Sequence, residues 1–221
     1  MSERITPQEN PGDKAKNEIS EENLLFTIWF KPKSTLEYIL KFCPDKFVIP
    51  LLILGGISRA FDQASNKNYG DSQSLFSVIF LAIIGGGLFG WISYYLYIWL
   101  LDVSGKWLQG KGSFSELKTI TAWSLVPSIF SLVFLIPEII IFGIDLFRSE
   151  MSGANGIKES ILYILGLLEF TCGIWTLVIF IKGVSIVQDF STSKSILNAI
   201  LPLFMLLILI LSFVFIIKTY F

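Results

Sequence analysis

The stretch from Leu81 to Phe114, LAIIGGGLFGWISYYLYIWLLDVSGKWLQGKGSF, decides the fold class of this chain. It begins as an apolar helix interrupted by glycines, continues as a helix rich in Trp and Tyr, and turns polar at Asp102. An apolar run of this length can cross the hydrocarbon core of a bilayer, which is about 30 Å thick. The stretch closes with the glycine loop Gly110-Lys111-Gly112. It therefore predicts a membrane helix followed by an aqueous loop.

The composition of the whole chain agrees with a membrane protein and excludes several classes of function. Of the 221 residues, 53% are hydrophobic and 16% are charged, whereas a soluble domain is about 25% charged. The net charge of -1 gives no reason to expect a nucleic-acid partner. The chain has no histidine and two cysteines, Cys43 and Cys172, so it offers no serine–histidine triad, disulfide framework or zinc ligand set. We expect no enzyme activity, no metal and no cofactor.

Five apolar segments are predicted to cross the membrane, which makes the chain an all-α membrane protein. Their approximate bounds are residues 47–64, 73–101, 119–147, 160–187 and 197–217, within a membrane domain of residues 47–221. The first is the weakest, because about 18 residues give only about 27 Å of helix and include Arg59 and Asp62. A re-entrant segment is the alternative for it. Pro127 and Pro137 interrupt the third segment, where we expect at least one kink.

Two different segments precede the first span. Residues 1–23 are rich in acidic side chains and contain no apolar core, so they predict a disordered acidic cytoplasmic tail and no signal peptide. Residues 24–46 predict an amphipathic helix that lies in the membrane interface, and Ser34 with Glu37 has the capping-box pattern that would start it. The apolar face of this helix comprises Leu36, Ile39, Leu40 and Cys43. A plain linker before the membrane is the alternative.

The basic residues predict the orientation of the chain. With five spans, twelve of the 17 Lys and Arg residues fall on the side of the N-terminus and five on the other side. Because Lys and Arg are retained on the cytoplasmic side of membranes, we expect a cytoplasmic N-terminus and a C-terminus outside the cell. The expected location is the plasma membrane, which in a bacterium is the inner membrane.

Glu169 is the deepest ionisable side chain in the predicted spans, and it is the best candidate for an intramembrane polar site. A carboxylate in the hydrocarbon layer is costly, and such residues are usually functional or paired. The functional interpretation is a proton- or cation-coupled site with Glu138 of the third span. The alternative, which we favour, is a protonated glutamate bonded to a neighbouring helix.

Small residues indicate where helices could pack closely. Gly86 and Gly90 in the second span have the small-xxx-small spacing that lets another backbone approach. Gly166 and Gly173 in the fourth span form a second small-residue face. This motif is common in apolar helices, and plain packing is its simplest meaning.

The loop that begins at Gly105, GKWLQGKGS, differs from a phosphate-binding loop by one position. A phosphate loop needs Ser or Thr directly after the lysine and a buried strand before the loop. Here Gly112 occupies the hydroxyl position and a membrane helix precedes the loop, so we interpret Gly110 and Gly112 as a tight turn. Ser113 and Glu116 have the capping-box pattern, which predicts the start of the next helix. The chain has no GxSxG or CxxC motif, and Ser104 has no evident base.

The order of these features resembles the Yip domain family, membrane proteins named for their interaction with Ypt/Rab GTPases. The resemblance covers residues 24–217, and it is closest to the bacterial branch. The segments that carry it are Trp29-Phe30-Lys31-Pro32 with Thr35, the loop Gly110-Lys111-Gly112-Ser113-Phe114, and Ala122-Trp123-Ser124-Leu125-Val126-Pro127. The chain lacks the acidic-Leu-Tyr-Gly-Pro signature of eukaryotic members, so a Rab-type GTPase is not an expected partner. The resemblance implies a non-enzymatic membrane protein, in some bacterial relatives tied to ABC-type exporters.

Three functions remain open on this basis. The first is a non-enzymatic adaptor or assembly factor for another membrane protein, with the bilayer, a membrane-protein partner or further copies of the chain as its contacts. The second is a small proton- or cation-coupled transporter or channel that uses Glu169. The third, an intramembrane enzyme acting on lipids, has only Ser104 and scattered acids to support it.

Overall fold

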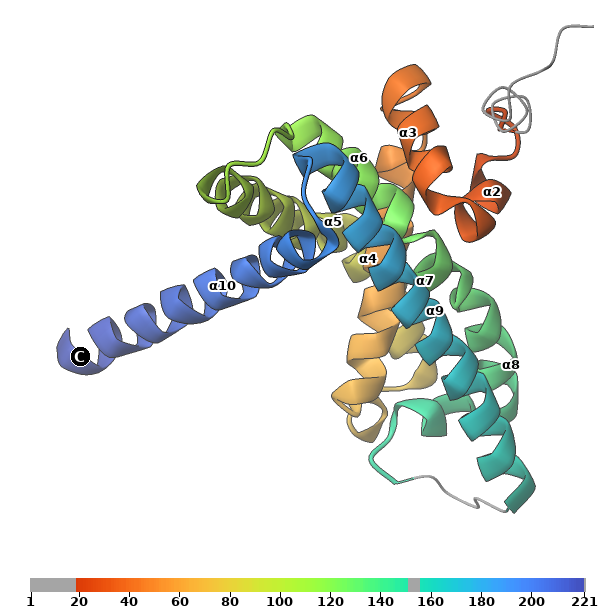
Figure 1. Ribbon diagram of the computed structural model, residues 1–221. Helices are drawn as coiled ribbons and strands as arrows, with labels where there is room; N and C mark the ends of the chain where they lie inside the picture. Colours follow the sequence, from red (N-terminus) through yellow and green to blue (C-terminus); the bar gives the residue numbers. More distant parts are fainter. Residues whose placement is uncertain (1–18, 151–155, 221) are drawn as a thin grey trace, which may run out of the picture.

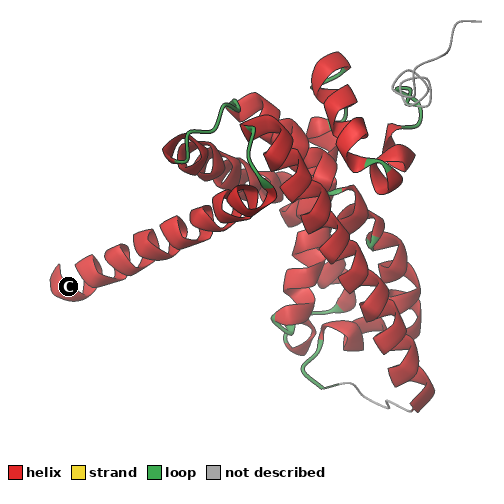
Figure 2. Cartoon of the chain, viewed as in Figure 1, coloured by secondary structure: helices red, strands yellow, loops and turns green. Residues whose placement is uncertain are grey.

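The computed structural model describes residues 19–150 and 156–220 (Figure 1). Every regular element of these residues is helical, which confirms the predicted all-α class (Figure 2). The α-helices are α2 (Leu24–Phe30), α3 (Pro32–Phe42), α4 (Val48–Asn66), α5 (Leu75–Trp107), α6 (Phe114–Ser124), α7 (Val126–Phe130), α8 (Leu132–Phe142), α9 (Gly156–Gln188) and α10 (Thr192–Tyr220). Two short 3₁₀ helices, η1 (Tyr69–Asp71) and η2 (Gly143–Phe147), join them. Of the predicted tail, residues 1–18 lie outside the described residues.

Four helical segments of the described chain are long and apolar enough to cross a membrane. They are Leu75–Trp107, Phe114–Phe147, Gly156–Gln188 and Thr192–Ser212, and they correspond to the second to fifth predicted spans. The first predicted span, residues 47–64, corresponds to α4, which is not among the four. At 33 residues each, α5 and α9 are about 50 Å long, so both exceed the thickness of the hydrocarbon core.

The helices α4 and α5 form an antiparallel hairpin, the broken third span packs against this hairpin, and α9 packs on the broken third span (Figure 1). The larger apolar core lies at the end of the bundle that holds α3, α6 and the last turns of α9, around the fully buried Trp123. The indole nitrogen of Trp123 donates to the carbonyl of Lys46 at 3.1 Å and so ties α6 to the start of α4. A smaller core around Phe61 and Phe147 lies at the opposite end.

The second span extends further than predicted. The sequence turns polar at Asp102, but α5 continues to Trp107. The reason is local, because Lys106 Nζ pairs with Asp102 Oδ2 at 2.6 Å, one turn apart on the helix. Charges at i and i+4 of opposite sign stabilise a helix. The loop to α6 is therefore shorter than expected and covers residues 108–113.

The third span is interrupted, as its prolines predict. It divides into α6, α7 and α8, with Pro127 in the first turn of α7. A break of this kind frees backbone carbonyls that other groups must satisfy. The carbonyl of Ser128 accepts from Ser58 Oγ of α4 at 3.1 Å and from Ser131 Oγ at 2.6 Å. Pro137 lies within α8 and does not end it.

The segment 24–46 is two short helices instead of one. The prediction that a helix starts at Ser34 is wrong, because α3 begins at Pro32, and proline is well suited to the first turn of a helix. Leu36 and Ile39 of the predicted apolar face are fully buried against the bundle. Trp175 Nε1 of α9 donates to the carbonyl of Trp29 at 3.2 Å, which fixes α2 on the same surface. The position of these helices in the membrane interface stays a prediction.

The helix α10 leaves the bundle and points away from it (Figure 1). Its first turns are held by α5, since Asn198 Nδ2 donates to the carbonyl of Leu101 at 3.1 Å and to Ser104 Oγ at 2.7 Å. Tyr97 Oη of α5 donates to the carbonyl of Ala199 at 2.9 Å. Further along, most of the described side chains of α10 are exposed, including Leu203, Phe204, Leu207 and Ile208.

Candidate functional site

A cavity lined by three carboxylic acids lies between α4, α8, η2 and α9. It has a volume of about 170 Å³, and we call it the acidic cavity because three of its side chains are carboxylic acids. Its lining comprises Phe61, Asp62, Ser65, Leu135, Glu138, Leu146, Phe147, Leu162, Gly166 and Glu169. The structure thus brings the predicted pair Glu138 and Glu169 to one cavity and adds Asp62 of the weakest predicted span.

The three acids come from three different helices. Glu138 follows Pro137 in α8 and is only 3% exposed. Glu169 of α9 is partly exposed and Asp62 of α4 is exposed, so these two stand nearer the opening. None of the three carboxyl groups makes a hydrogen bond or ion pair with a described residue, and none of the described Lys and Arg residues lines the cavity. Glu138 therefore has no partner within the described chain, and its carboxyl group is accessible from the cavity.

The acidic cavity is not arranged as a metal centre. Among the described residues, no group of three or more His, Cys, Asp or Glu side chains could hold a metal ion. The acids line the walls of a mixed cavity whose other surfaces are largely aliphatic and aromatic. Such a cavity can exchange protons or accept a positively charged group, because both reduce the cost of an unpaired carboxylate.

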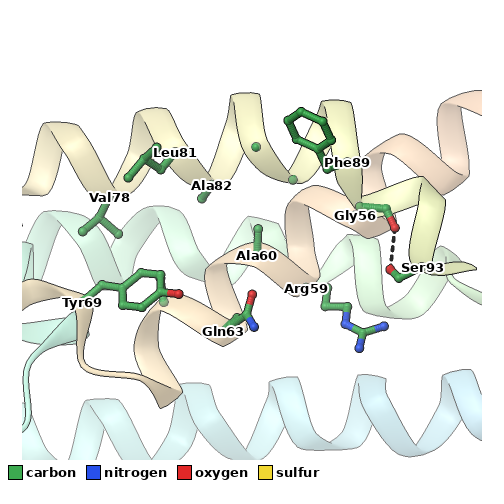
Figure 3. Close-up of a pocket in the computed structure, with 14 residues that line it drawn as sticks. Gly56, Arg59, Ala60, Gln63, Tyr69, Val78, Leu81, Ala82, Phe89 and Ser93 are labelled. Atoms are coloured by element: carbon green, nitrogen blue, oxygen red, sulfur yellow. Dashed lines mark hydrogen bonds between the residues drawn. The ribbon is translucent and has the colours of Figure 1, made fainter. Parts of the chain in front are cut away.

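The predicted packing glycines differ in their surroundings. Gly86 and Gly90 of α5 face α4, where a Cβ atom on Gly86 would lie 2.8 Å from the carbonyl oxygen of Gly56. A pocket of about 380 Å³ opens beside this contact, between Ala60 and Gln63 of α4 and the facing residues of α5, which include Ala82 (Figure 3). A Cβ atom on Gly166 or Gly173 of α9, in contrast, would meet no described atom within 4 Å.

The glycine loop is held by the end of α9, and this contact rules out the phosphate-loop interpretation. Gly112 N donates to Gln188 Oε1 at 3.0 Å, and Lys111 N donates to the carbonyl of Gln188 at 3.3 Å. Gly110 N donates to the carbonyl of Gly105, and Ser113 N to Glu116 Oε2. A phosphate cradle needs free backbone N–H groups, and four successive donors are occupied here.

The sequence analysis missed Gln188 and Asn198, both of which are almost fully buried. Gln188 is 1% exposed and fills the space that a side chain at Gly105 or Gly110 would need. Asn198 lies on α10 and joins it to Leu101 and Ser104 of α5. A signal was present for Asn198, because an amide within an apolar span is costly unless it is bonded to a neighbouring helix. The predicted capping box of Ser113 and Glu116 is confirmed at the start of α6.

The comparisons with known proteins agree with this architecture. The family model described as the Yip1 domain matches residues 26–214, nearly the range over which the sequence resembles the Yip domain family. No curated protein and no solved structure matches the chain.

Proposed function

The chain belongs to the Yip1 domain family, and from this premise we propose that it is a non-enzymatic adaptor or assembly factor for another membrane protein. With four helical segments that are long and apolar enough to cross a bilayer, it is an integral membrane protein. The resemblance to bacterial relatives favours an ABC-type exporter as the partner. A Rab-type GTPase is not proposed, because the chain lacks the eukaryotic signature.

The observation that carries this proposal is the projecting helix α10. Its first turns pack against α5 and α9, whereas most of its described side chains from Leu203 onward are exposed (Figure 1). Helices in membranes associate through van der Waals packing and hydrogen bonds between helices. A long apolar helix that leaves its own bundle forgoes this packing within the chain. Such a helix can pack instead against the helices of a partner protein.

Site-specific photo-cross-linking in cells tests the adaptor role. A photoreactive amino acid at Leu207 of α10 is expected to capture one discrete membrane protein, which then also co-purifies with the wild-type chain in mild detergent. The matched control is Phe80 of α5, which is exposed as well but lies on a helix already packed in the bundle. Cross-links from Leu207 to lipid alone, together with repeated purification of the chain by itself, would contradict the adaptor role.

We further propose five crossings, a cytoplasmic N-terminus and the bacterial inner membrane. In support, α4 runs antiparallel to the lower part of α5 between the same two ends of the bundle (Figure 1), and most basic residues fall on the side of the N-terminus. With the native cysteines replaced, a membrane-impermeant thiol reagent is expected to label a cysteine at Lys67 from outside the cell. Cysteines at Lys41, which precedes α4, and at Lys111 should react only after permeabilisation. Labelling of Lys41 and Lys67 from the same side would show that α4 does not cross and would contradict this topology.

The acidic cavity favours a second candidate, a small proton- or cation-coupled transporter. Three acids at one intramembrane cavity, with no base among its described lining residues, are typical of sites through which protons or cations pass. Purified protein in proteoliposomes should then catalyse cation or proton flux, and Glu169→Gln should abolish it. No flux in the wild type, or equal flux in the variant, would eliminate this candidate.

A further inference from the structure

One face of α9 is not covered by another described helix and carries two glycines. Gly166, Glu169 and Gly173 are spaced by three and four residues, so they lie on one face of the helix. A Cβ atom on either glycine would meet no described atom within 4 Å. We call these three residues the glycine face. Small residues at this spacing let a second helix approach the backbone closely, and within the described chain no helix does so here.

The glycine face leads into the acidic cavity. Gly166 and Glu169 line this cavity together with Glu138 of α8. Glu138 is 3% exposed and has no hydrogen-bond or ion-pair partner among the described residues. The carboxyl group of Glu138 is accessible from the cavity and has no partner within the described chain, so a group that enters from outside the chain can pair with it.

The charges around the cavity define the chemistry of that partner. Asp62, Glu138 and Glu169 all line it, and no described Lys or Arg does. Arg59 lies one turn before Asp62 on α4, but it does not line the acidic cavity. A group that enters the cavity therefore binds most favourably if it carries a positive charge on an apolar stem.

We propose that the glycine face docks a transmembrane helix of the partner protein, and that a lysine or arginine of this helix enters the acidic cavity. The inference rests on the proposed adaptor function and names the chemistry by which the partner is recognised. The helix backbone packs on Gly166 and Gly173. The stem of the basic side chain packs on apolar lining residues such as Leu162, and its charged end pairs with Glu138 and Glu169.

The size and composition of the cavity favour a basic side chain over a bound ion. About 170 Å³ is several times the volume of about 30 Å³ that one water occupies in the liquid. The described acids also form no cluster able to hold a metal ion. A flexible basic side chain can reach separate carboxyl groups through several N–H donors, which a single small ion cannot do.

Defined peptides in liposomes test the proposal. The probe is a labelled Leu–Ala transmembrane peptide with one central lysine, and its counterpart has leucine at that position. Energy transfer to the labelled full-length protein measures association. We expect the lysine peptide to bind about tenfold more tightly than the leucine peptide, which corresponds to about 1.4 kcal/mol. Equal binding of the two peptides would overturn the proposal.

Variants separate the charge from the packing. The double variant Glu138→Gln with Glu169→Gln should remove the preference for lysine, and Gly166→Leu should weaken both peptides. Glu159→Gln is the matched control, since Glu159 is an exposed acid of the same helix outside the cavity. An undiminished preference in the double variant would contradict the proposal. Self-association of the chain that depends on Arg59 would also contradict the proposal, because the basic side chain in the cavity would then be Arg59 of a second copy.

The same variants distinguish this inference from the adaptor function itself. If a partner cross-links to α10 and co-purifies equally with wild type and with the double variant, the adaptor function stands and the docking site is wrong. If no partner is captured at all, the adaptor function fails. A loss of co-purification in the double variant, with Glu159→Gln unaffected, supports both.

Discussion

A Cβ atom on Gly90 of α5 would lie 2.5 Å from the Cα atom of Gly56 of α4, so the two helices touch backbone to backbone at this point. The contact lies in the middle of the α4–α5 hairpin, and neither backbone can move aside without displacing its helix. The hairpin therefore depends on the absence of two side chains.

Substitution of Gly90 by alanine should destabilise the protein, although alanine is the better helix former by about 1 kcal/mol. The added methyl group overlaps backbone atoms of Gly56, and overpacking of this kind costs about 1–3 kcal/mol. Gly85→Ala is the matched control, because a Cβ atom there meets nothing within 4 Å. Thermal unfolding in mild detergent should show a lower midpoint for Gly90→Ala and an unchanged or higher one for Gly85→Ala. Equal midpoints would contradict the contact.

Substitution of Gln188 by leucine should loosen the glycine loop. Leucine keeps much of the volume but leaves the partly buried Gly112 N–H group without its acceptor, and the loss of such a hydrogen bond costs about 0.5–1.5 kcal/mol. Trypsin should then cleave after Lys111 faster than in the wild type, as followed by mass spectrometry. The same change at the exposed Gln63 serves as the control. An unchanged rate in Gln188→Leu would show that other contacts hold the loop.

The sequence predicts much of this fold and less of its candidate site. Hydropathy alone indicates the long helices, because each must satisfy its backbone within the bilayer. The loop that ends at Ser113 and the break at Pro127 follow from local chemistry that the sequence displays. The cavity of Asp62, Glu138 and Glu169 joins three helices, and no spacing rule within one helix reveals such a meeting. Gln188 escaped notice for a similar reason, since its partner is a backbone N–H far away in the chain.

The ion pair between Lys111 and Asp189 should give the loop a defined pH dependence. The hydrogen bond from Lys111 Nζ to Asp189 Oδ2, at 2.6 Å, raises the pKa of Lys111 and lowers the pKa of Asp189. The contribution of Asp189 is present above its ordinary pKa and is lost as the pH falls through the lowered value. The contribution of Lys111 is present below its ordinary pKa and is lost as the pH rises through the raised value. Both side chains are exposed, so the effect is small and weakens with salt.

An NMR titration of the Asp189 carboxyl group measures this pair directly. In Lys111→Met the pKa of Asp189 should return upward toward its ordinary value. Lys194→Met is the control, because Lys194 lies over the ring of Phe190 and has no part in the shift of Asp189. An unaltered pKa of Asp189 in Lys111→Met would show that Lys111 and Asp189 do not pair in the membrane-inserted protein.

Substitution of Asn198 by leucine should weaken the attachment of the first turns of α10 to α5. Asn198 is fully buried, and its side-chain amide makes two hydrogen bonds to α5, to the Leu101 carbonyl and to Ser104 Oγ. Hydrogen bonds between membrane helices contribute about 0.6–1.7 kcal/mol each. After their loss, α5 and α10 keep the hydrogen bond from Tyr97 Oη to the carbonyl of Ala199. Spin labels at Leu96 and Leu203 should report a broader distance distribution in Asn198→Leu. Ser212→Ala, an exposed position further along α10, should leave the distribution as in the wild type. A distribution in Asn198→Leu as narrow as that of the control would mean that apolar packing alone fixes the direction in which α10 leaves the bundle.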